Sequence, residues 1–310
     1  MTKNERLIKL MGLFSNNYDK VGPGISKNPN EKAPFFKFFE IYFSHFSKMI
    51  ILNLLFIIAL LPFALIFLVE NLGLDDMKST IVFYVAFCIL GSVIGPAMCG
   101  VMRICRNIAT ERPVFIWHDF WKAVKTNLKQ GLIMGLIDST TIVLMSFAIP
   151  MYFDMAEQNS LFYVPFLICL VCAFIFVMMH FYIYLFIVST TLSLWKILKN
   201  SFYLTAIEIK TSIANFLITV LLFLIVYLMW PYSSFAVILI PSLLGLLYAF
   251  NNFPAIRKYV IQPYYDARGE QNPEFAYLNT EEESVFTDTP ETEEPPVQEK
   301  KPKGKNKTIR

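Results

Sequence analysis

Long apolar stretches separated by short polar segments are the dominant pattern along this chain. A bilayer core about 30 Å thick needs roughly 20 consecutive apolar residues in a helix. The stretches lack the strict alternation of a membrane β-barrel strand, so the pattern predicts membrane-spanning helices. Those of sufficient length lie between Lys48 and Glu70, between Lys78 and Arg103, at 130–153, at 161–190 and between Lys210 and Arg257.

The last stretch is too long for a single crossing, because one helix from Lys210 to Arg257 would reach about 70 Å. Its sequence Trp-Pro-Tyr-Ser-Ser at 230–234 combines a proline, small polar residues and interfacial aromatic residues, which favours a break. The chain is therefore predicted to have an all-α integral membrane fold with six transmembrane helices. Pro62 predicts a kink in the first of them.

The charged residues between these stretches predict how the helices cross the membrane. Cytoplasmic loops are enriched in lysine and arginine, and six spans place every strongly basic segment on one side. The basic residues of these segments are Lys3, Arg6, Lys9, Lys20, Lys27, Lys32, Lys37, Lys48, Arg103, Arg106, Arg112, Lys122, Lys125, Lys129, Lys196, Lys199, Lys210, Arg257, Lys258 and Arg268. The opposite side carries Glu70, Asp75, Asp76, Asp154 and Glu157, with Lys78 as its single basic residue. We therefore expect a multi-pass protein of the cell membrane with both termini in the cytoplasm.

Two segments between the predicted spans, 116–129 and 192–209, show the period of amphipathic helices. Each carries an apolar stripe with tryptophan and a polar face with lysine, which is typical of a helix lying among lipid headgroups. The expected anchors are Trp117, Trp121, Lys122, Lys125, Trp195, Lys196 and Lys199. We expect two cytoplasmic interfacial helices, with the lipid bilayer as their partner.

The composition agrees with a membrane location. Of the 310 residues, 55% are hydrophobic and only 16% are charged, whereas soluble domains carry about 25% charged residues. Charge also divides the chain into an N-terminal cytoplasmic segment at 1–34, a polytopic helical membrane domain at 35–265 and a tail at 266–310. The tail is acidic and proline-containing, then basic, and it has too little apolar surface to order itself, so we expect a disordered cytoplasmic tail.

Asp138 and His180 are the ionisable residues that lie well inside predicted spans. Such a group is costly in a bilayer unless it is satisfied, so it indicates a functional or structural site. Both residues lie at a similar depth on consecutive antiparallel spans, so they are expected to form a hydrogen-bonded pair. The pair could stabilise the helix bundle, or it could line a polar cavity used in transport or proton relay.

Two further features are candidates of the same kind. Asn53 lies in the first predicted span and is expected to form a hydrogen bond between helices. Gly95-Pro96 interrupts the second span, either as a packing kink or as the broken helix of a transporter site.

Motifs for chemistry are absent. The chain has no Walker-type phosphate loop, no dinucleotide fingerprint, no zinc-protease motif and no nucleophile elbow. Its three histidines, His45, His118 and His180, lie on different segments, so neither a metal site nor another cofactor is expected. The basic residues spread along one membrane face, which does not indicate nucleic-acid binding. We expect a protein that is not an enzyme; the sequence leaves its oligomeric state open.

Several segments, in their order and spacing, resemble the YesL-like membrane proteins of bacteria, a domain family of unknown function. The resemblance covers about residues 10 to 265 and rests on Met11-Gly12-Leu13-Phe14, Gly22-Pro23-Gly24, Phe35-Phe36-Lys37-Phe38-Phe39-Glu40, Leu52-Asn53-Leu54-Leu55, Gly95-Pro96-Ala97, Phe115-Ile116-Trp117-His118-Asp119-Phe120-Trp121 and Asn127-Leu128-Lys129-Gln130-Gly131-Leu132. It implies a link to carbohydrate uptake and utilisation. The function expected from it is a non-enzymatic accessory or scaffold protein associated with a carbohydrate transport complex; the alternative is a small solute transporter or channel with a polar intramembrane site.

Overall fold

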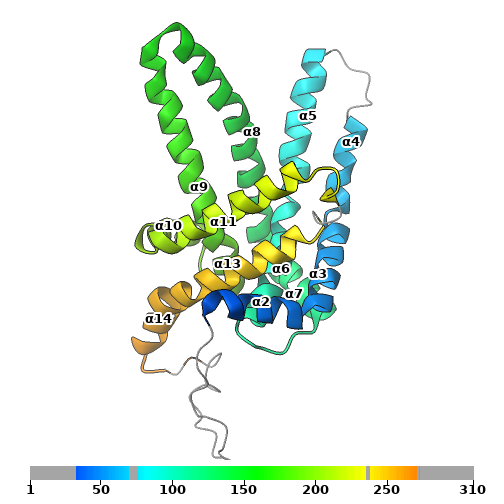
Figure 1. Ribbon diagram of the computed structural model, residues 1–310, viewed down its shortest axis with the longest axis vertical. Helices are drawn as coiled ribbons and strands as arrows, with labels where there is room; N and C mark the ends of the chain where they lie inside the picture. Colours follow the sequence, from blue (N-terminus) through cyan, green and yellow to red (C-terminus); the bar gives the residue numbers. More distant parts are fainter. Residues whose placement is uncertain (1–32, 70–75, 235–237, 271, 273–310) are drawn as a thin grey trace, which may run out of the picture. The chain divides into compact units, whose positions relative to one another are not determined.

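The structure, a computed structural model, describes residues 33–69, 76–234, 238–270 and 272, and every regular element within them is helical (Figure 1). The elements are α2 (Pro34–Ser44), α3 (Phe46–Ala59), the 3₁₀ helix η1 (Leu61–Leu65), α4 (Ile66–Val69), α5 (Asp76–Gly91), α6 (Ile94–Ala109), α7 (Ile116–Thr126), α8 (Leu128–Gln158), the 3₁₀ helix η2 (Ser160–Phe162), α9 (Tyr163–Ser189), α10 (Leu194–Ile207), α11 (Ile209–Leu228), α13 (Ile240–Ile256), the π-helix η3 (Arg257–Ile261) and α14 (Gln262–Asp266).

The chain divides into two compact units, Met1–Val260 and Ile261–Arg310. The helices that concern the candidate site all belong to the first unit, and α14 belongs to the second. Almost all of the predicted N-terminal segment at 1–34 and of the predicted tail at 266–310 lies outside the described residues.

Four helical segments of the described residues are long and apolar enough to cross a membrane. They are Thr80–Ala109, Leu128–Gln158, Ser160–Ser189 and Ile209–Leu228, with mean hydropathies of 2.0 to 2.8. Only 6% to 22% of the residues in each apolar window are buried within the protein. An apolar surface that is exposed to this extent requires an apolar environment such as a lipid bilayer. The chain is therefore a membrane protein.

A fifth crossing is available if α2 and α3 form one span, although the two helices meet at a bend of 72°. The apolar run predicted as the first span does not continue as one α-helix. It ends at Ala59, turns into the 3₁₀ helix η1 with Pro62 near its start, and resumes as the short α4. Proline lacks the amide hydrogen that an α-helix needs and clashes with the preceding turn, which accounts for the break.

The sixth predicted span corresponds to α13, which has 17 residues and is not among these candidates. A helix of that length is at the lower limit for crossing the hydrocarbon core. The predicted break between the last two spans lies after Leu228, where α11 ends, and includes a cis bond between Trp230 and Pro231. Six spans therefore remain a prediction, beside four to five candidates in the part of the chain that the structure describes.

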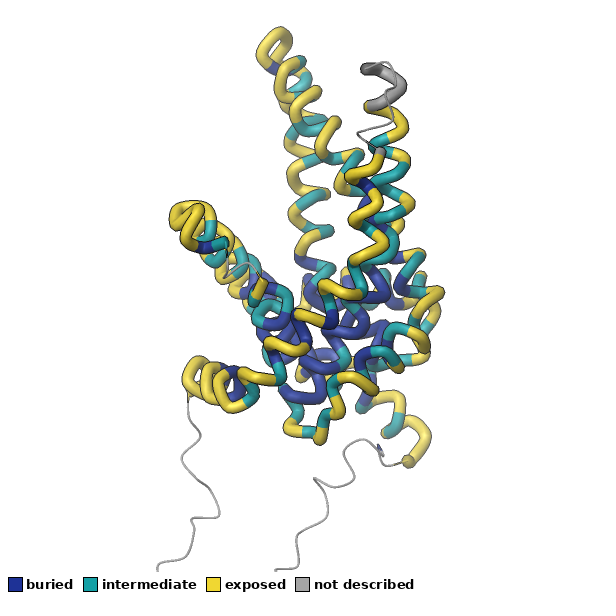
Figure 2. The backbone as a smooth tube through the Cα atoms, turned by 90° about the vertical axis from the view of Figure 1, so that its right-hand side faces the viewer, coloured by how far each residue is buried: buried dark blue, intermediate teal, exposed yellow. Residues whose placement is uncertain are grey.

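Helix α6 lies in the core of the bundle, and its buried residues run from Gly95 to Ile108. It packs against α3, α7, α8, α9 and α13. Figure 2 shows that buried residues gather at one end of the bundle, whereas the α8–α9 hairpin extends from it with mostly exposed and half-buried residues. The protein core is thus concentrated near one end of the long helices.

Candidate functional site

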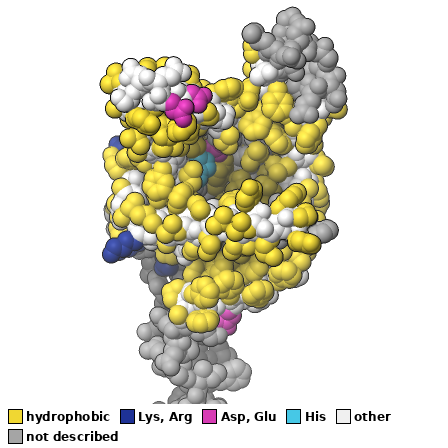
Figure 3. All heavy atoms as spheres, turned by 45° about the horizontal axis from the view of Figure 1, so that its top comes forward, with side chains coloured by type: hydrophobic (Ala, Val, Ile, Leu, Met, Phe, Trp, Pro, Cys, Tyr) yellow, Lys and Arg dark blue, Asp and Glu magenta, His cyan; other side chains and the backbone are white. Residues whose placement is uncertain are grey.

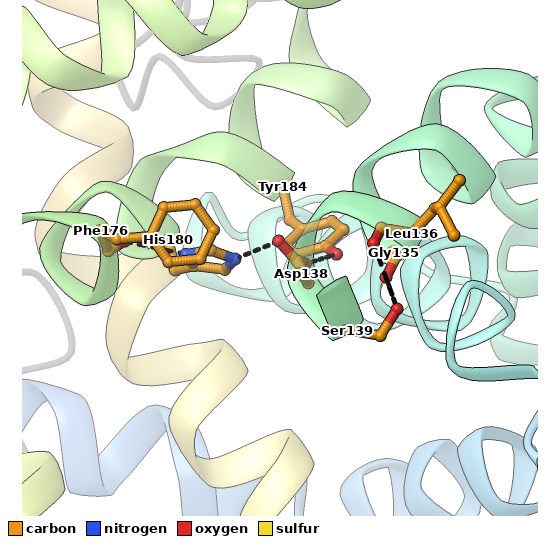
Figure 4. Close-up of polar contacts among 7 residues, drawn as sticks. All are labelled: Gly135, Leu136, Asp138, Ser139, Phe176, His180 and Tyr184. Carbon is orange, nitrogen blue, oxygen red and sulfur yellow. Dashed lines mark hydrogen bonds and ion pairs between the residues drawn. The ribbon is translucent and has the colours of Figure 1, made fainter. Parts of the chain in front are cut away.

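The α8–α9 hairpin brings Asp138 and His180 together. Its turn includes Asn159, whose side chain accepts a hydrogen bond from the amide of Leu161. Asp138 lies as many residues before Asn159 as His180 lies after it, so the antiparallel helices place both side chains at one level. The Nε2 atom of His180 lies 2.7 Å from Oδ1 of Asp138 (Figure 4). The pairing that the sequence predicted from depth is therefore present.

Tyr184 completes this cluster. It lies one helical turn after His180, on the same face of α9, and its hydroxyl donates to Oδ2 of Asp138 at 2.5 Å (Figure 4). The Nδ1 atom of His180 lies 2.9 Å from the carbonyl oxygen of Phe176. Both oxygens of Asp138 and both ring nitrogens of His180 thus have hydrogen-bond partners. We refer to Asp138, His180 and Tyr184 as the polar clasp of the hairpin.

The hydrogen bonds define how many protons the clasp holds. A carbonyl oxygen only accepts, so Nδ1 of His180 carries a hydrogen that it donates to Phe176. The contact between Nε2 and Oδ1 of Asp138 needs a second hydrogen between the two atoms. The pair is therefore either imidazolium with carboxylate or neutral imidazole with carboxylic acid. Its net charge is zero in both forms, which lowers the cost of placing it in a bilayer.

The clasp is not sealed inside the bundle. The side chain of Asp138 is 18% exposed and that of His180 is 25% exposed. In Figure 3 hydrophobic side chains predominate among the described residues of the visible face, and a histidine next to an acidic side chain lies deeper between them. The clasp is thus partly exposed at the surface of the helix bundle.

Ser139, the neighbour of Asp138 on α8, joins the hairpin to α5. Its hydroxyl contacts the carbonyl oxygen of Cys88 at 3.0 Å and that of Gly135 in its own helix at 2.8 Å. A Cβ atom on Gly91 of α5 would lie only 2.8 Å from the Cβ atom of Ser139. Helix α8, which carries Asp138 of the polar clasp, is therefore also held close to α5.

The candidate helix break at Gly95-Pro96 lies where α6 meets α8. Helix α5 ends at Gly91, and Gly95 and Pro96 fall in the first turn of α6. A Cβ atom on Gly95 would lie 1.9 Å from the carbonyl oxygen of Gly131, and one on Gly135 would lie 2.3 Å from that of Ser92. Small residues spaced in this way let two helix backbones touch. The segment 80–109 is still long and apolar enough to count as one span, and Gly95 lies where that span approaches α8 closely.

Asn53 of α3 forms the expected hydrogen bonds between helices. Its Oδ1 accepts from the amide of Ser242 at 2.9 Å, and its Nδ2 donates to the hydroxyl of Ser242 at 2.8 Å. Ser242 lies in the first turn of α13, where backbone amides have no partner within their own helix. Asn53 therefore caps α13 from a neighbouring helix, and both side chains are fully buried.

A second polar cluster was not predicted from the sequence. Asn215 of α11 donates to Asn252 of α13 at 2.8 Å and accepts from Asn251 at 2.6 Å. Asn252 in turn donates to the carbonyl oxygen of Phe181 on α9 at 3.1 Å. The amide side chains inside apolar stretches were a signal that could have indicated it, as Asn53 did. This cluster, like Asn53, connects helices and contains no titratable group.

The expected interfacial anchors lie on α7 and α10, and none of them is among the residues that the bundle buries. Helix α7 buries Phe120 and Ala123, while Trp117 is 64% exposed. Helix α10 buries Ile197, Ser201, Leu204 and Thr205. The remaining anchors are half-buried or exposed: Trp121, Lys122, Lys125, Trp195, Lys196 and Lys199.

The helix predicted at 116–129 is shorter in the structure. Helix α7 ends at Thr126, because the chain turns at Asn127 and α8 begins at Leu128.

Among the described residues, no three His, Cys, Asp or Glu side chains gather as a metal site requires.

Residues 79–149 match a family model described as a protein of unknown function, DUF624. No curated protein and no solved structure matches the chain. The matched region contains α6, α7 and most of α8, and it includes Asp138 and Gly95. His180 and Tyr184 lie outside it, so the complete polar clasp is a feature of this structure and not of the matched region.

Proposed function

We propose that this membrane protein is a non-enzymatic accessory or scaffold protein of a carbohydrate uptake or utilisation system. The observation that carries the proposal is the complete hydrogen bonding of the polar clasp. Each oxygen of Asp138 accepts from a side chain of α9, and each ring nitrogen of His180 has its own partner. The ionisable pair in the span is thus explained by joining α8 to α9, with no ligand required. The link to carbohydrate rests on the YesL-like resemblance.

The topology belongs to the same proposal. Six spans in the cell membrane, with both termini in the cytoplasm, gather the basic segments on one side. The exposed indoles of Trp117 and Trp195 then lie at the cytoplasmic surface of the bilayer, together with Lys122 and Lys196. A soluble partner would meet the protein at this surface.

Affinity purification of the tagged full chain from its native membranes tests the accessory role. The expected result is recovery of a carbohydrate permease or its solute-binding component in a constant ratio to the tagged chain. The control is the tagged Ser146→Ala variant, which should recover the same component. This substitution removes an exposed hydroxyl on α8 that bonds only within its own helix. Recovery of the tagged chain alone, in several mild detergents, contradicts the proposal.

A second candidate is a small solute transporter that couples movement to protons. It is favoured by one observation, namely that the partly exposed clasp holds a proton between Asp138 and His180. Intramembrane carboxylate and histidine pairs of this kind occur in proton relays. A carrier would exchange this proton with solution on each side of the membrane in turn.

Proteoliposomes that contain a pH-sensitive dye separate the two candidates. Sugars of several classes are tested with an imposed pH gradient. If the protein is a carrier, at least one of these sugars produces proton movement. Asp138→Asn abolishes this movement, while Ser146→Ala leaves it unchanged. A flux that is equal in Asp138→Asn and the unmodified protein excludes the clasp as the transport site.

A further inference from the structure

A basic cleft lies at the end of the α8–α9 hairpin that is opposite to its turn. It has a volume of about 480 Å³ and is bordered by α6, α7, the start of α8 and the end of α9. Its polar lining comes mainly from Arg103, Asp119, Lys122, Lys129, Gln130 and the run Ser189-Thr190-Thr191. The cleft does not include the polar clasp, so it is a separate site.

The charge of this cleft favours an anion. The lining contains three basic residues, Arg103, Lys122 and Lys129, and a single acidic residue, Asp119. One carboxylate oxygen of Asp119 already accepts a hydrogen bond from the amide of Phe115 at 2.9 Å. No described acidic residue lies within ion-pair distance of Lys122 or Lys129. Two lysines of the lining therefore have no counter-ion among the described residues.

The cleft also has a fixed part. Arg103 donates to the carbonyl oxygen of Val188 at 3.0 Å, in the last turn of α9, where carbonyl oxygens lack partners within the helix. This bond holds the guanidinium at the wall of the cleft. The residues that follow Val188, namely Ser189, Thr190 and Thr191, also line the cleft. Guanidinium, ammonium and hydroxyl groups are the donors that bind phosphate oxygens in proteins.

An aromatic recess adjoins the basic cleft. It is lined by Trp117, His118, Trp121, Lys122, Lys125 and Thr126, and has a volume of about 500 Å³. Lys122 and Thr126 line both cavities. Leu128, at the start of α8, is 46% exposed beside them. A basic cavity thus lies next to indole rings and exposed apolar side chains, which is complementary to a molecule with an anionic head and an apolar body.

We propose that the basic cleft binds the headgroup phosphate of an anionic glycerophospholipid, with Lys122 and Lys129 as the principal charged contacts. The ends of two membrane helices border the cleft, which is the level at which headgroups lie in a bilayer. The adjoining tryptophans receive the glycerol and upper acyl region, as interfacial aromatic residues do. This site rests on the membrane location of α8 and α9 and is independent of any protein partner.

The test uses the purified full chain in neutral detergent. Dihexanoyl-phosphatidylglycerol, dihexanoyl-phosphatidylcholine and inorganic phosphate are titrated separately below their micelle concentrations. Tryptophan fluorescence gives the affinity, and native mass spectrometry gives the number of bound lipids. The expected result is saturable binding of phosphatidylglycerol, at least tenfold tighter than that of phosphatidylcholine, which corresponds to about 1.4 kcal/mol.

The variant Lys122→Gln with Lys129→Gln is expected to weaken phosphatidylglycerol binding by about tenfold or more, since two charge-assisted contacts are lost. The matched control, Lys210→Gln with Lys258→Gln, removes two exposed lysines that line neither cavity and are not among the expected anchors, and it should change the affinity by less than about twofold. Equal loss in both double variants, or no loss in either, overturns the cleft. Binding of inorganic phosphate as tight as that of the lipid overturns the lipid as ligand. Co-purification of a transport protein is not affected by these outcomes, so the accessory role is tested separately.

Discussion

At the scale of single residues, polarity inside apolar stretches was the most useful information in the sequence. The depth of Asp138 and His180 predicted their contact, because antiparallel neighbours place equal depths side by side. Tyr184 was missed, since a tyrosine in an apolar helix resembles an ordinary core residue. The spacing of one turn between His180 and Tyr184 could have indicated it, because both then face Asp138.

The polar clasp should contribute measurably to stability. Asp138→Ala leaves Nε2 of His180 and the hydroxyl of Tyr184 without their partner. A buried group that loses its partner costs about 1–3 kcal/mol. We expect a lower melting temperature in detergent by scanning fluorimetry, whereas Ser146→Ala on the same helix should melt like the unmodified protein. Equal melting temperatures for Asp138→Ala and Ser146→Ala would show that the clasp does not join α8 to α9.

Asn53 should stabilise the start of α13 specifically. Asn53→Ala removes the acceptor of the Ser242 amide, and loss of a helix cap costs about 1 kcal/mol. Hydrogen exchange at residues 240–243 should become faster in this variant. Ser242→Ala keeps the bond between its backbone amide and Asn53, so its exchange there should rise less. The opposite order of the two variants would contradict capping by Asn53.

At the scale of helices, the length and position of the apolar runs predicted α8, α9 and α11 well, because hydrophobicity decides which segments enter a bilayer. Helix faces are harder to predict. On α10 the bundle buries the face with Ile197 and Leu204, whereas Trp195 of the tryptophan stripe is 77% exposed, and the predicted contact of that stripe with lipid headgroups stays a prediction. A stripe that faces lipid and one that faces protein look alike in a sequence when both surroundings are apolar. The 72° bend between α2 and α3 was not predicted, since the bend at His45 has no proline or glycine.

The contact between α6 and α8 should depend on the absence of side chains at their crossing. Gly95→Ala places a methyl group 1.9 Å from a backbone oxygen, which cannot move without separating the helices. Gly100→Ala meets the ring of Phe120 at 2.5 Å, and a side chain can shift more easily than a backbone. We expect Gly95→Ala to lower the melting temperature more than Gly100→Ala, and a larger effect of Gly100→Ala would argue against backbone contact at Gly95.

At the scale of the whole molecule, the sequence predicted a polytopic helical membrane protein, and the described helices agree. The number of crossings is harder to predict, because α13 is short and its preceding break contains residues that suit either an outer loop or a bend. Hydrogen bonds also connect α13 to Asn53 and to Asn215, and the sequence alone does not show which polar groups pair in this way. These long-range partners depend on how helices pack and not on local pattern.

The six-span topology predicts on which side each loop can be labelled. In a variant without native cysteines, Lys125→Cys should react only with reagent that reaches the cytoplasm. Glu157→Cys and Tyr232→Cys, the latter at a position that is 86% exposed, should react from the outer side. Labelling is measured in intact cells with a membrane-impermeant maleimide. Reaction at position 232 only from the cytoplasm would mean that α11 and α13 do not both cross.

The helices of this protein differ greatly in length. Helix α8 has 31 residues and α13 has 17, which corresponds to roughly 46 Å and 26 Å along their axes. If α13 crosses the membrane, as the six-span prediction requires, no single hydrocarbon thickness matches both helices, and the long one tilts or protrudes where the short one just spans. In that topology we expect the acyl-chain length of the surrounding lipid to change the tilt of the hairpin. Bilayer thickness thus becomes a physical variable to which this protein should respond.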